Sequence, residues 1–116
     1  VRFDIFDIND KNPMWWKYFA ASDLVLLPYR GGIGSGMFAH AVAAGIPVIA
    51  SDIQFFREIA DKSNCIRVAK KEEDYPQVIK RAMKDIVEMR KGCKKYLATY
   101  GLSKVSKEYI KIYKQL

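Results

Sequence analysis

Residues 21–59 have the sequence ASDLVLLPYRGGIGSGMFAHAVAAGIPVIASDIQFFREI, in which short apolar runs alternate with loop and helix patterns. The uniformly apolar run Leu24–Leu27 ends at Pro28, which is typical of a buried strand in a parallel sheet. Four glycines follow within the seven residues 30–36 and predict a tight loop. The stretch therefore opens with a strand that ends in a glycine-rich loop.

The second half of this stretch predicts a helix and another strand. Small residues over 37–44 favour a helix, and Gly45 stands where glycine commonly ends one. The apolar run 46–50 predicts the next strand, which ends at Ser51-Asp52. Strands joined through a helix favour parallel pairing with a right-handed crossover. The predicted fold class is therefore α/β, a parallel sheet flanked by helices.

The alternation of strand and helix patterns extends to both sides of residues 21–59. Residues 1–8 alternate apolar and polar positions and predict a strand, and a helix with Trp15, Phe19 and Ala20 inward is predicted to end near Ala21. A short helix over 54–60 and a strand over 65–69 follow. The four parallel strands are expected to centre on Ile5, Val25, Val48 and Ile66.

Two long helices, at about 75–100 and 103–116, are predicted to end the chain. Apolar residues at three-and-four spacing form one stripe along the first helix and another along the second. We expect the second helix to pack by its Leu102, Val105, Tyr109 and Ile112 face. The first stripe comprises Val78, Ala82, Ile86, Met89, Cys93 and Tyr96.

Composition narrows the function classes. The chain has 116 residues, enough for one compact domain, and a formal net charge of +7. Its basic residues are spread among acidic ones at helical spacing, so a solvated helical surface is favoured over nucleic-acid binding. A phosphate-rich ligand or an anionic membrane surface would also suit this charge. The two cysteines are expected to be free thiols, with a disulfide left open.

The glycine-rich loop is the main candidate site. A strand that ends in such a loop and enters a helix directs backbone N–H groups and the positive helix end towards a ligand, which suits phosphate. The glycine spacing matches neither the P-loop nor a strict dinucleotide fingerprint. A tight turn that merely lets the helix pack on the sheet therefore stays an alternative.

The wider pattern resembles the core of family-4 retaining glycosyltransferases. Their motifs correspond here to Ser22-Asp23 before a strand that ends in proline, and to a glycine loop whose helix ends in Ala41–Gly45. Pro47-Val48 and Glu58-Ile59 match the steps that follow. The terminal segment 95–116 is similar to the family's closing helices. The resemblance covers nearly the whole chain.

This resemblance implies that residues 1–116 are part of the C-terminal, Rossmann-like donor-binding domain of a GT-B enzyme, with the first strands of its sheet upstream of Val1. The enzyme would transfer a hexosyl-type sugar from a nucleotide-sugar, with retention, in glycan biosynthesis. A sugar or lipid-linked acceptor would bind an N-terminal domain, and the fragment alone is expected to be inactive. The expected location is cytoplasmic, with peripheral membrane contact open, and we expect neither a metal nor another cofactor.

The family's two site glutamates are missing. Gly32 and His40 stand at their positions. The imidazole of His40 can still bond a ribose hydroxyl, although a space-filling role in its helix stays open. No catalytic residue is assigned. The expected donor-binding residues are Arg30, Gly32, Ile33, Gly34, Ser35, Gly36, His40 and Glu58.

Two other functions stay open. A GT-B nucleotide-sugar epimerase would use the same sheet but needs carboxylates that this loop lacks. A non-catalytic nucleotide-sugar-binding module would keep the fold without the chemistry, and the missing glutamates favour it. Activity of the full-length parent with labelled nucleotide-sugars would distinguish these functions from transfer.

Overall fold

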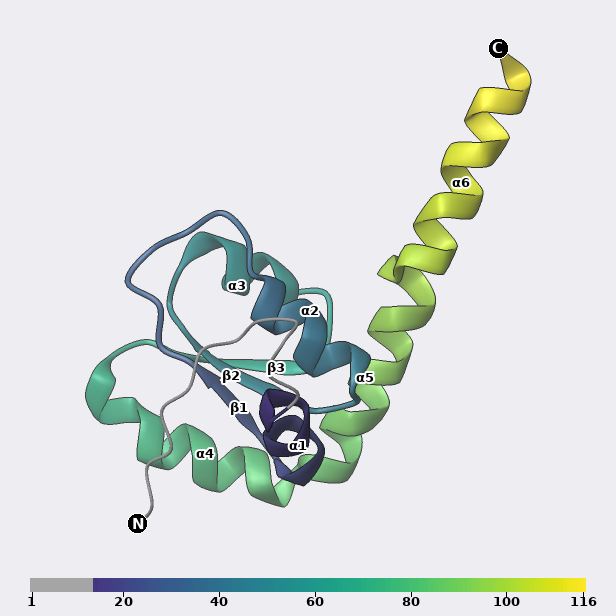
Figure 1. The fold of residues 1–116 in the computed structure, drawn as a ribbon. Coiled ribbons are helices and arrows are strands. Elements are labelled where there is room, and N and C mark those ends of the chain that lie inside the picture. The colour runs from purple at the N-terminus through teal and green to yellow at the C-terminus, as the bar shows by residue number, and fades with distance from the viewer. Residues whose placement is uncertain (1–13) are drawn as a thin grey trace.

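The computed structural model describes residues 14–116, so the predicted strand over 1–8 lies outside the described residues. Three strands form one parallel sheet in the order β1-β2-β3, with helices between them (Figure 1). This confirms the α/β fold class. The elements in chain order are α1 (Met14–Ala21), β1 (Val25–Leu27), α2 (Gly36–Ala43), β2 (Val48–Ser51), α3 (Gln54–Ala60), β3 (Ile66–Ala69), the short 3₁₀ helix η1 (Glu72–Asp74), α4 (Tyr75–Lys84), α5 (Ile86–Tyr100) and α6 (Leu102–Gln115).

The sheet has the parallel register that its apolar runs predict. Val25 pairs with Val48, and Val48 pairs with Ile66, so the predicted strand centres align across the sheet. Because successive side chains of a strand point to opposite faces, β2 serves two cores at once. Val48 and Ala50 belong to the larger core, whereas Ile49 belongs to the smaller one.

Helices cover both faces of this sheet. Figure 1 shows α2 and α3 on one side and α4 on the other. The larger core lies under α2 and α3 and includes Phe38 and Phe56, together with Trp15 and Phe19 of α1. The inward positions predicted for Trp15 and Phe19 are confirmed, whereas Ala20 is exposed.

Gly45 ends α2 as the sequence predicts. Its φ of +75° lies in the left-handed region, which glycine enters without steric cost. The Gly45 N–H bonds to the Val42 carbonyl, and the Ile46 N–H bonds to the Ala41 carbonyl. These two bonds form a Schellman motif, which turns the chain directly into β2.

The single helix predicted over 75–100 is in fact two helices, α4 and α5, separated at Asp85. Ala82 of α4 and Met89 of α5 pack in the smaller core, but Cys93 packs in the larger core on the other side of the sheet. α4 contributes only to the smaller core, whereas α5 begins in the smaller core and continues into the larger one, so the chain changes direction between the two helices. The apolar stripe is real, since none of its members is exposed, but its spacing does not reveal the bend.

The packing predicted for the last helix is wrong. No residue of α6 is buried by the part of the chain that the structure describes, and Leu102 is 85% exposed. Figure 1 shows α6 standing away from the sheet. Gly101 adopts an extended backbone conformation (φ −64°, ψ 153°) between α5 and α6, and this directs the apolar face of α6 away from both cores. Among the described residues, no helix is long and apolar enough to cross a membrane.

Candidate functional site

The candidate site lies at the carboxyl edge of the sheet. All three strands are parallel, so the loops after β1, β2 and β3 meet at this one edge. Open α/β sheets bind their ligands at this edge. The residues that follow β1 make up the glycine-rich loop, and those that follow β3 include Lys70 and Lys71.

The glycine-rich loop is fixed at both of its ends. The Ser35 hydroxyl caps α2 by accepting the Phe38 N–H at 3.0 Å. The same oxygen lies 3.0 Å from the Tyr29 hydroxyl, which is at the start of the loop. The Tyr29 ring packs against Phe56 of the core, with ring centroids 5.5 Å apart. A core aromatic residue therefore holds the N-terminus of α2 over the end of β1.

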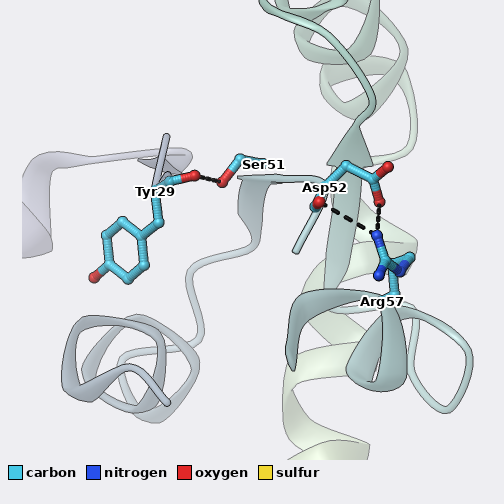
Figure 2. Close-up of polar contacts among 4 residues, drawn as sticks. All are labelled: Tyr29, Ser51, Asp52 and Arg57. Atoms are coloured by element: carbon cyan, nitrogen blue, oxygen red, sulfur yellow. Dashed lines mark hydrogen bonds and ion pairs between the residues drawn. The ribbon is translucent and has the colours of Figure 1, made fainter. Parts of the chain in front are cut away.

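A second set of bonds joins the ends of β1 and β2. The Ser51 hydroxyl donates to the Tyr29 carbonyl oxygen, as Figure 2 shows. Beside it, Arg57 donates to the Asp52 carboxylate at 2.8 Å and to the Asp52 carbonyl at 3.3 Å. This ion pair neutralises the one carboxylate that directly follows β2. The Ser51 hydroxyl therefore ties the ends of β1 and β2 together, and the negative charge of Asp52 is compensated.

Three of the expected donor-binding residues line one pocket. Gly32, Ile33 and Glu58 surround a hollow of about 240 Å³, together with Gln54 and Phe55 of α3. The Gln54 amide donates to the Glu58 carboxylate at 2.9 Å. Ile33 is 99% exposed at the tip of the loop, and Gly32 has a φ of +140°. We call this hollow the loop–α3 pocket.

Arg30 lines a neighbouring hollow of about 300 Å³, which we call the strand-end pocket. Residues at the ends of all three strands form its wall: Pro28 directly after β1, Ser51 at the end of β2 and Lys70 directly after β3. Tyr75, at the start of α4, completes it. Burial raises the pKa of the Tyr75 hydroxyl, and the neighbouring Ser51 hydroxyl lowers it in part. The enclosed Tyr75 oxygen reaches towards Ser51 without completing a hydrogen bond of good geometry among the described residues.

His40 lies apart from both pockets. Its ring meets the rings of Trp15 and Trp16 edge-on, at centroid distances of 5.3 and 5.6 Å. The residue is exposed, and it lines a mainly apolar groove of about 420 Å³ between α2 and α5, which also reaches Ser35. The imidazole thus has a packing partner that the sequence did not reveal, and its ribose role stays a prediction.

The remaining expected residues, Gly34 and Gly36, lie in the exposed part of the loop and at the first position of α2. Space around both is open, since an added Cβ would meet no atom within 4 Å. The loop amides from Gly31 to Gly36 donate to no other backbone group of the described chain. They are therefore available to an anion.

Sequence reasoning missed several residues at this edge. Tyr29 and Ser51 hold the loop, and Lys70, Lys71 and Tyr75 line the strand-end pocket. The signal was present for all of them except Tyr75, because each closes or closely follows a predicted strand and the carboxyl ends of parallel strands share one edge. Within residues 14–116, no three His, Cys, Asp or Glu side chains gather into a metal-binding group.

A scan against protein-family models matches residues 11–88 to the model described as glycosyl transferases group 1. The match covers more than half of the chain's 116 residues. The chain belongs to this family. A search of curated proteins and a search of solved structures found no match.

Membership in the group 1 glycosyl transferases agrees with the resemblance inferred from the sequence and places the chain among transferases of sugars. The matched residues include the whole glycine-rich loop, α2 and α3, and thus every expected donor-binding residue from Arg30 to Glu58. Most of α5 and all of α6 lie beyond the match. The family description therefore applies to the sheet and its carboxyl edge.

Proposed function

We propose that this domain binds the nucleotide-sugar donor of a retaining, family-4-type GT-B glycosyltransferase, as part of its C-terminal half. The observation that carries the proposal is the glycine-rich loop at the carboxyl edge of the sheet. Its amides have no other backbone partner in the described chain, and the capped N-terminus of α2 adds a positive partial charge. A hexosyl-type sugar would pass to a sugar or lipid-linked acceptor held by another domain.

The donor diphosphate would lie against the loop between Gly31 and Gly36. There the loop amides, the α2 N-terminus and the guanidinium of Arg30 would stabilise the negative charge that develops on the departing diphosphate. Lys70 and Lys71 extend this positive field across the strand-end pocket. This chemistry requires no metal and no cofactor from the residues described, which is part of the proposal.

The loop–α3 pocket and the groove lined by His40 would hold different parts of the donor. Glu58 in the loop–α3 pocket is held by Gln54, so its second carboxylate oxygen can accept a sugar hydroxyl. Ile33, exposed at the rim, offers an apolar surface for the sugar ring or base. His40 would reach the ribose from α2, along the groove that it shares with Ser35.

A non-catalytic nucleotide-sugar-binding module is the second candidate, and one observation favours it. Gly32 replaces the family's sugar-binding glutamate, and the Ser35 hydroxyl, which was expected to help, is already bonded to Tyr29 and to the Phe38 N–H. The loop thus holds phosphate better than it positions a sugar for reaction. Assays of the full-length parent with labelled nucleotide-sugars distinguish transfer from binding alone.

Binding is tested on the chain itself with uridine, guanosine and adenosine diphosphates. We expect one of them to shift the amide resonances of Gly31–Gly36, and Gly34→Val to weaken its affinity about tenfold or more through steric exclusion from the loop. Gly34 has open space and no positive φ, so valine should leave the fold intact. Ala98→Val on the exposed face of α5 is the matched control.

If none of the diphosphates perturbs the loop amides, the donor-site proposal is wrong for this chain. If a diphosphate shifts resonances around Tyr75 and Lys70 only, the ligand occupies the strand-end pocket instead. Equal weakening by Gly34→Val and Ala98→Val would show that the valine acts on the fold and not on the ligand.

Peripheral membrane contact is a separate part of the proposal, supported by α6. Its exposed apolar residues include Leu102, Tyr109 and Ile112, and its opposite face carries Lys104, Lys107, Lys111 and Lys114. A helix of this kind can lie in the surface of an anionic bilayer. Co-sedimentation with vesicles that contain phosphatidylserine, and not with pure phosphatidylcholine vesicles, would support it.

A further inference from the structure

Two cysteines meet in the core at the end of β3 opposite to the candidate site. Cys65 directly precedes β3, and Cys93 lies on α5. Both are free thiols, both are completely buried, and both belong to the larger core. Neither has a role in the donor site.

A glycine brings the two segments into close contact. If Gly92 carried a Cβ, that atom would lie 2.8 Å from the backbone nitrogen of Cys65 and 2.8 Å from the backbone carbon of Asn64. The backbone of α5 therefore touches the chain at Cys65, one residue before Cys93. Disulfides join residues whose backbones are close, with Cα atoms about 4.4–6.8 Å apart, and the close approach of α5 to Cys65 favours this geometry.

The two thiols also interact directly and unequally. The interaction with the Cys93 thiol, together with smaller effects of Ser63 and Arg67, lowers the pKa of Cys65 to about 7 despite its burial. The same interaction raises the pKa of Cys93. Cys65 is therefore the thiol that ionises first and reacts first, and Cys93 is placed to attack it afterwards.

We propose that Cys65 and Cys93 form a redox-responsive pair, which hydrogen peroxide converts into an intramolecular disulfide between the start of β3 and α5. The Cys65 thiolate would attack one peroxide oxygen, breaking the O–O bond and releasing hydroxide, to give a sulfenic acid. The Cys93 sulfur would then attack the Cys65 sulfur and release water as its own proton leaves. Overall, two thiols and one peroxide give one disulfide and two waters.

The cross-link would stabilise the fold, because it closes a loop from β3 through α4 and α5. Such a loop, of about 30 residues, restricts the unfolded chain enough to raise the melting temperature by on the order of 10 °C if native geometry is kept. Because the sulfurs are buried, a small oxidant such as hydrogen peroxide is required, and local opening of α5 would set the rate.

The test uses the full chain. The chain is first reduced, then treated with hydrogen peroxide in native buffer, and finally digested under non-reducing conditions. We expect a peptide pair joined through Cys65 and Cys93, a higher melting temperature, and reversal of both by dithiothreitol. Cys65→Ser and Cys93→Ser should each abolish the cross-link. Because either substitution can also disturb the core, the peptide map of the unsubstituted chain is the deciding measurement.

Three results would overturn the proposal. After exhaustive peroxide treatment, both cysteines could still be free thiols, which alkylation of the unfolded chain would show. Cys65 could instead reach the sulfinic acid, or join a second chain, without an internal cross-link. Finally, the cross-link could form only in urea-unfolded chain, which would show that the native contact does not produce it.

Discussion

At the scale of residues, Ser35 connects the structure of the loop with its proposed function. One hydroxyl caps α2 through the Phe38 N–H and also bonds the hydroxyl of Tyr29. The loop between them is thereby held at both ends while its glycine amides stay free of other backbone partners in the described chain. Stability and anion binding depend on the same side chain for different reasons, so they can be separated by substitution.

Ser35→Ala should lower the free energy of unfolding by about 1 kcal/mol, because it removes the helix cap. Ser35→Asp should keep most of that stability, since aspartate is an equally good cap, but its charge should repel the donor diphosphate. Urea denaturation measures the first effect and diphosphate titration the second. If Ser35→Asp binds diphosphate as well as the parent does, the phosphates do not lie at the α2 N-terminus.

His40→Ala should weaken donor binding several-fold, since a neutral hydrogen bond contributes about 0.5–1.5 kcal/mol, and His40→Glu should restore binding. The ring also packs against Trp15 and Trp16, so loss of packing must be separated from loss of a ligand contact. Trp16→Ala is the control, because Trp16 is on the exposed side of the same contact. Equal weakening by Trp16→Ala, or none by His40→Ala, would assign His40 to packing.

At the scale of elements, close approach and bending determine how the helices meet the sheet. α5 touches the start of β3 at Gly92. α4 and α5 are separated at Asp85, and α4 packs in the smaller core whereas α5 packs in both cores. α6 leaves the domain at Gly101, where a Cβ would lie 2.4 Å from the Leu97 carbonyl oxygen. Glycine at these positions therefore fixes helix placement.

Gly92→Ala should destabilise the domain by up to about 2 kcal/mol. Alanine favours a helix interior by about 1 kcal/mol, but here its methyl group would press on the backbone of Asn64 and Cys65, and such overpacking costs about 1–3 kcal/mol. Gly31→Ala, which has open space, is the matched control and should be nearly neutral. A stabilised Gly92→Ala variant would contradict the close approach of α5 to β3.

Ile112→Lys on α6 should change the free energy of unfolding by less than about 0.5 kcal/mol, because its side chain is exposed in the described chain. Met89→Ala, in the smaller core, should cost about 2–5 kcal/mol. Urea denaturation compares the two. A large cost for Ile112→Lys would show that α6 packs in solution as the apolar stripe first predicted.

At the scale of the whole molecule, a compact layered domain carries a projecting helix. The principal extents are 55 × 35 × 28 Å, and Figure 1 shows that α6 accounts for much of the long axis. The proposed donor site lies at the carboxyl edge of the sheet and the cysteine pair lies at the start of β3, so the two are on opposite sides of the domain. The larger core contacts both sites. Its residue Phe56 packs against Tyr29 at the start of the glycine-rich loop, and its residue Cys93 is one of the two cysteines.

Global stability should rise with pH above about 7 under reducing conditions. The folded-state pKa of Cys65 is lowered to about 7, below that of an ordinary thiol. At pH values between these two pKa values, the unfolded chain therefore binds more protons than the folded chain, and stability rises with pH. This stabilisation is lost as pH falls through 7. The raised pKa of Cys93 acts in the opposite direction, but only above the ordinary thiol pKa.

Urea denaturation at several pH values from 6 to 9 measures this dependence, and Cys65→Ser should flatten it. A parent chain whose stability is constant over that range would show that Cys65 stays protonated in the folded state.

The sequence by itself determined the parallel α/β sheet, because short apolar runs, two of them ended by Pro28 or Ser51-Asp52, predict strands locally, and the helices between them favour parallel pairing. It also located the glycine-rich loop and, through Gly45, the end of α2. Only the tertiary structure decided which residues meet: Tyr29 with Ser35, Cys65 with Cys93, and His40 with two tryptophans. It also decided the bend at Asp85 and the exposure of α6. The spacing of apolar residues predicts that a helix has an apolar face. What covers that face depends on the direction of the backbone at one or two residues, such as Asp85 and Gly101, and periodicity does not encode that direction.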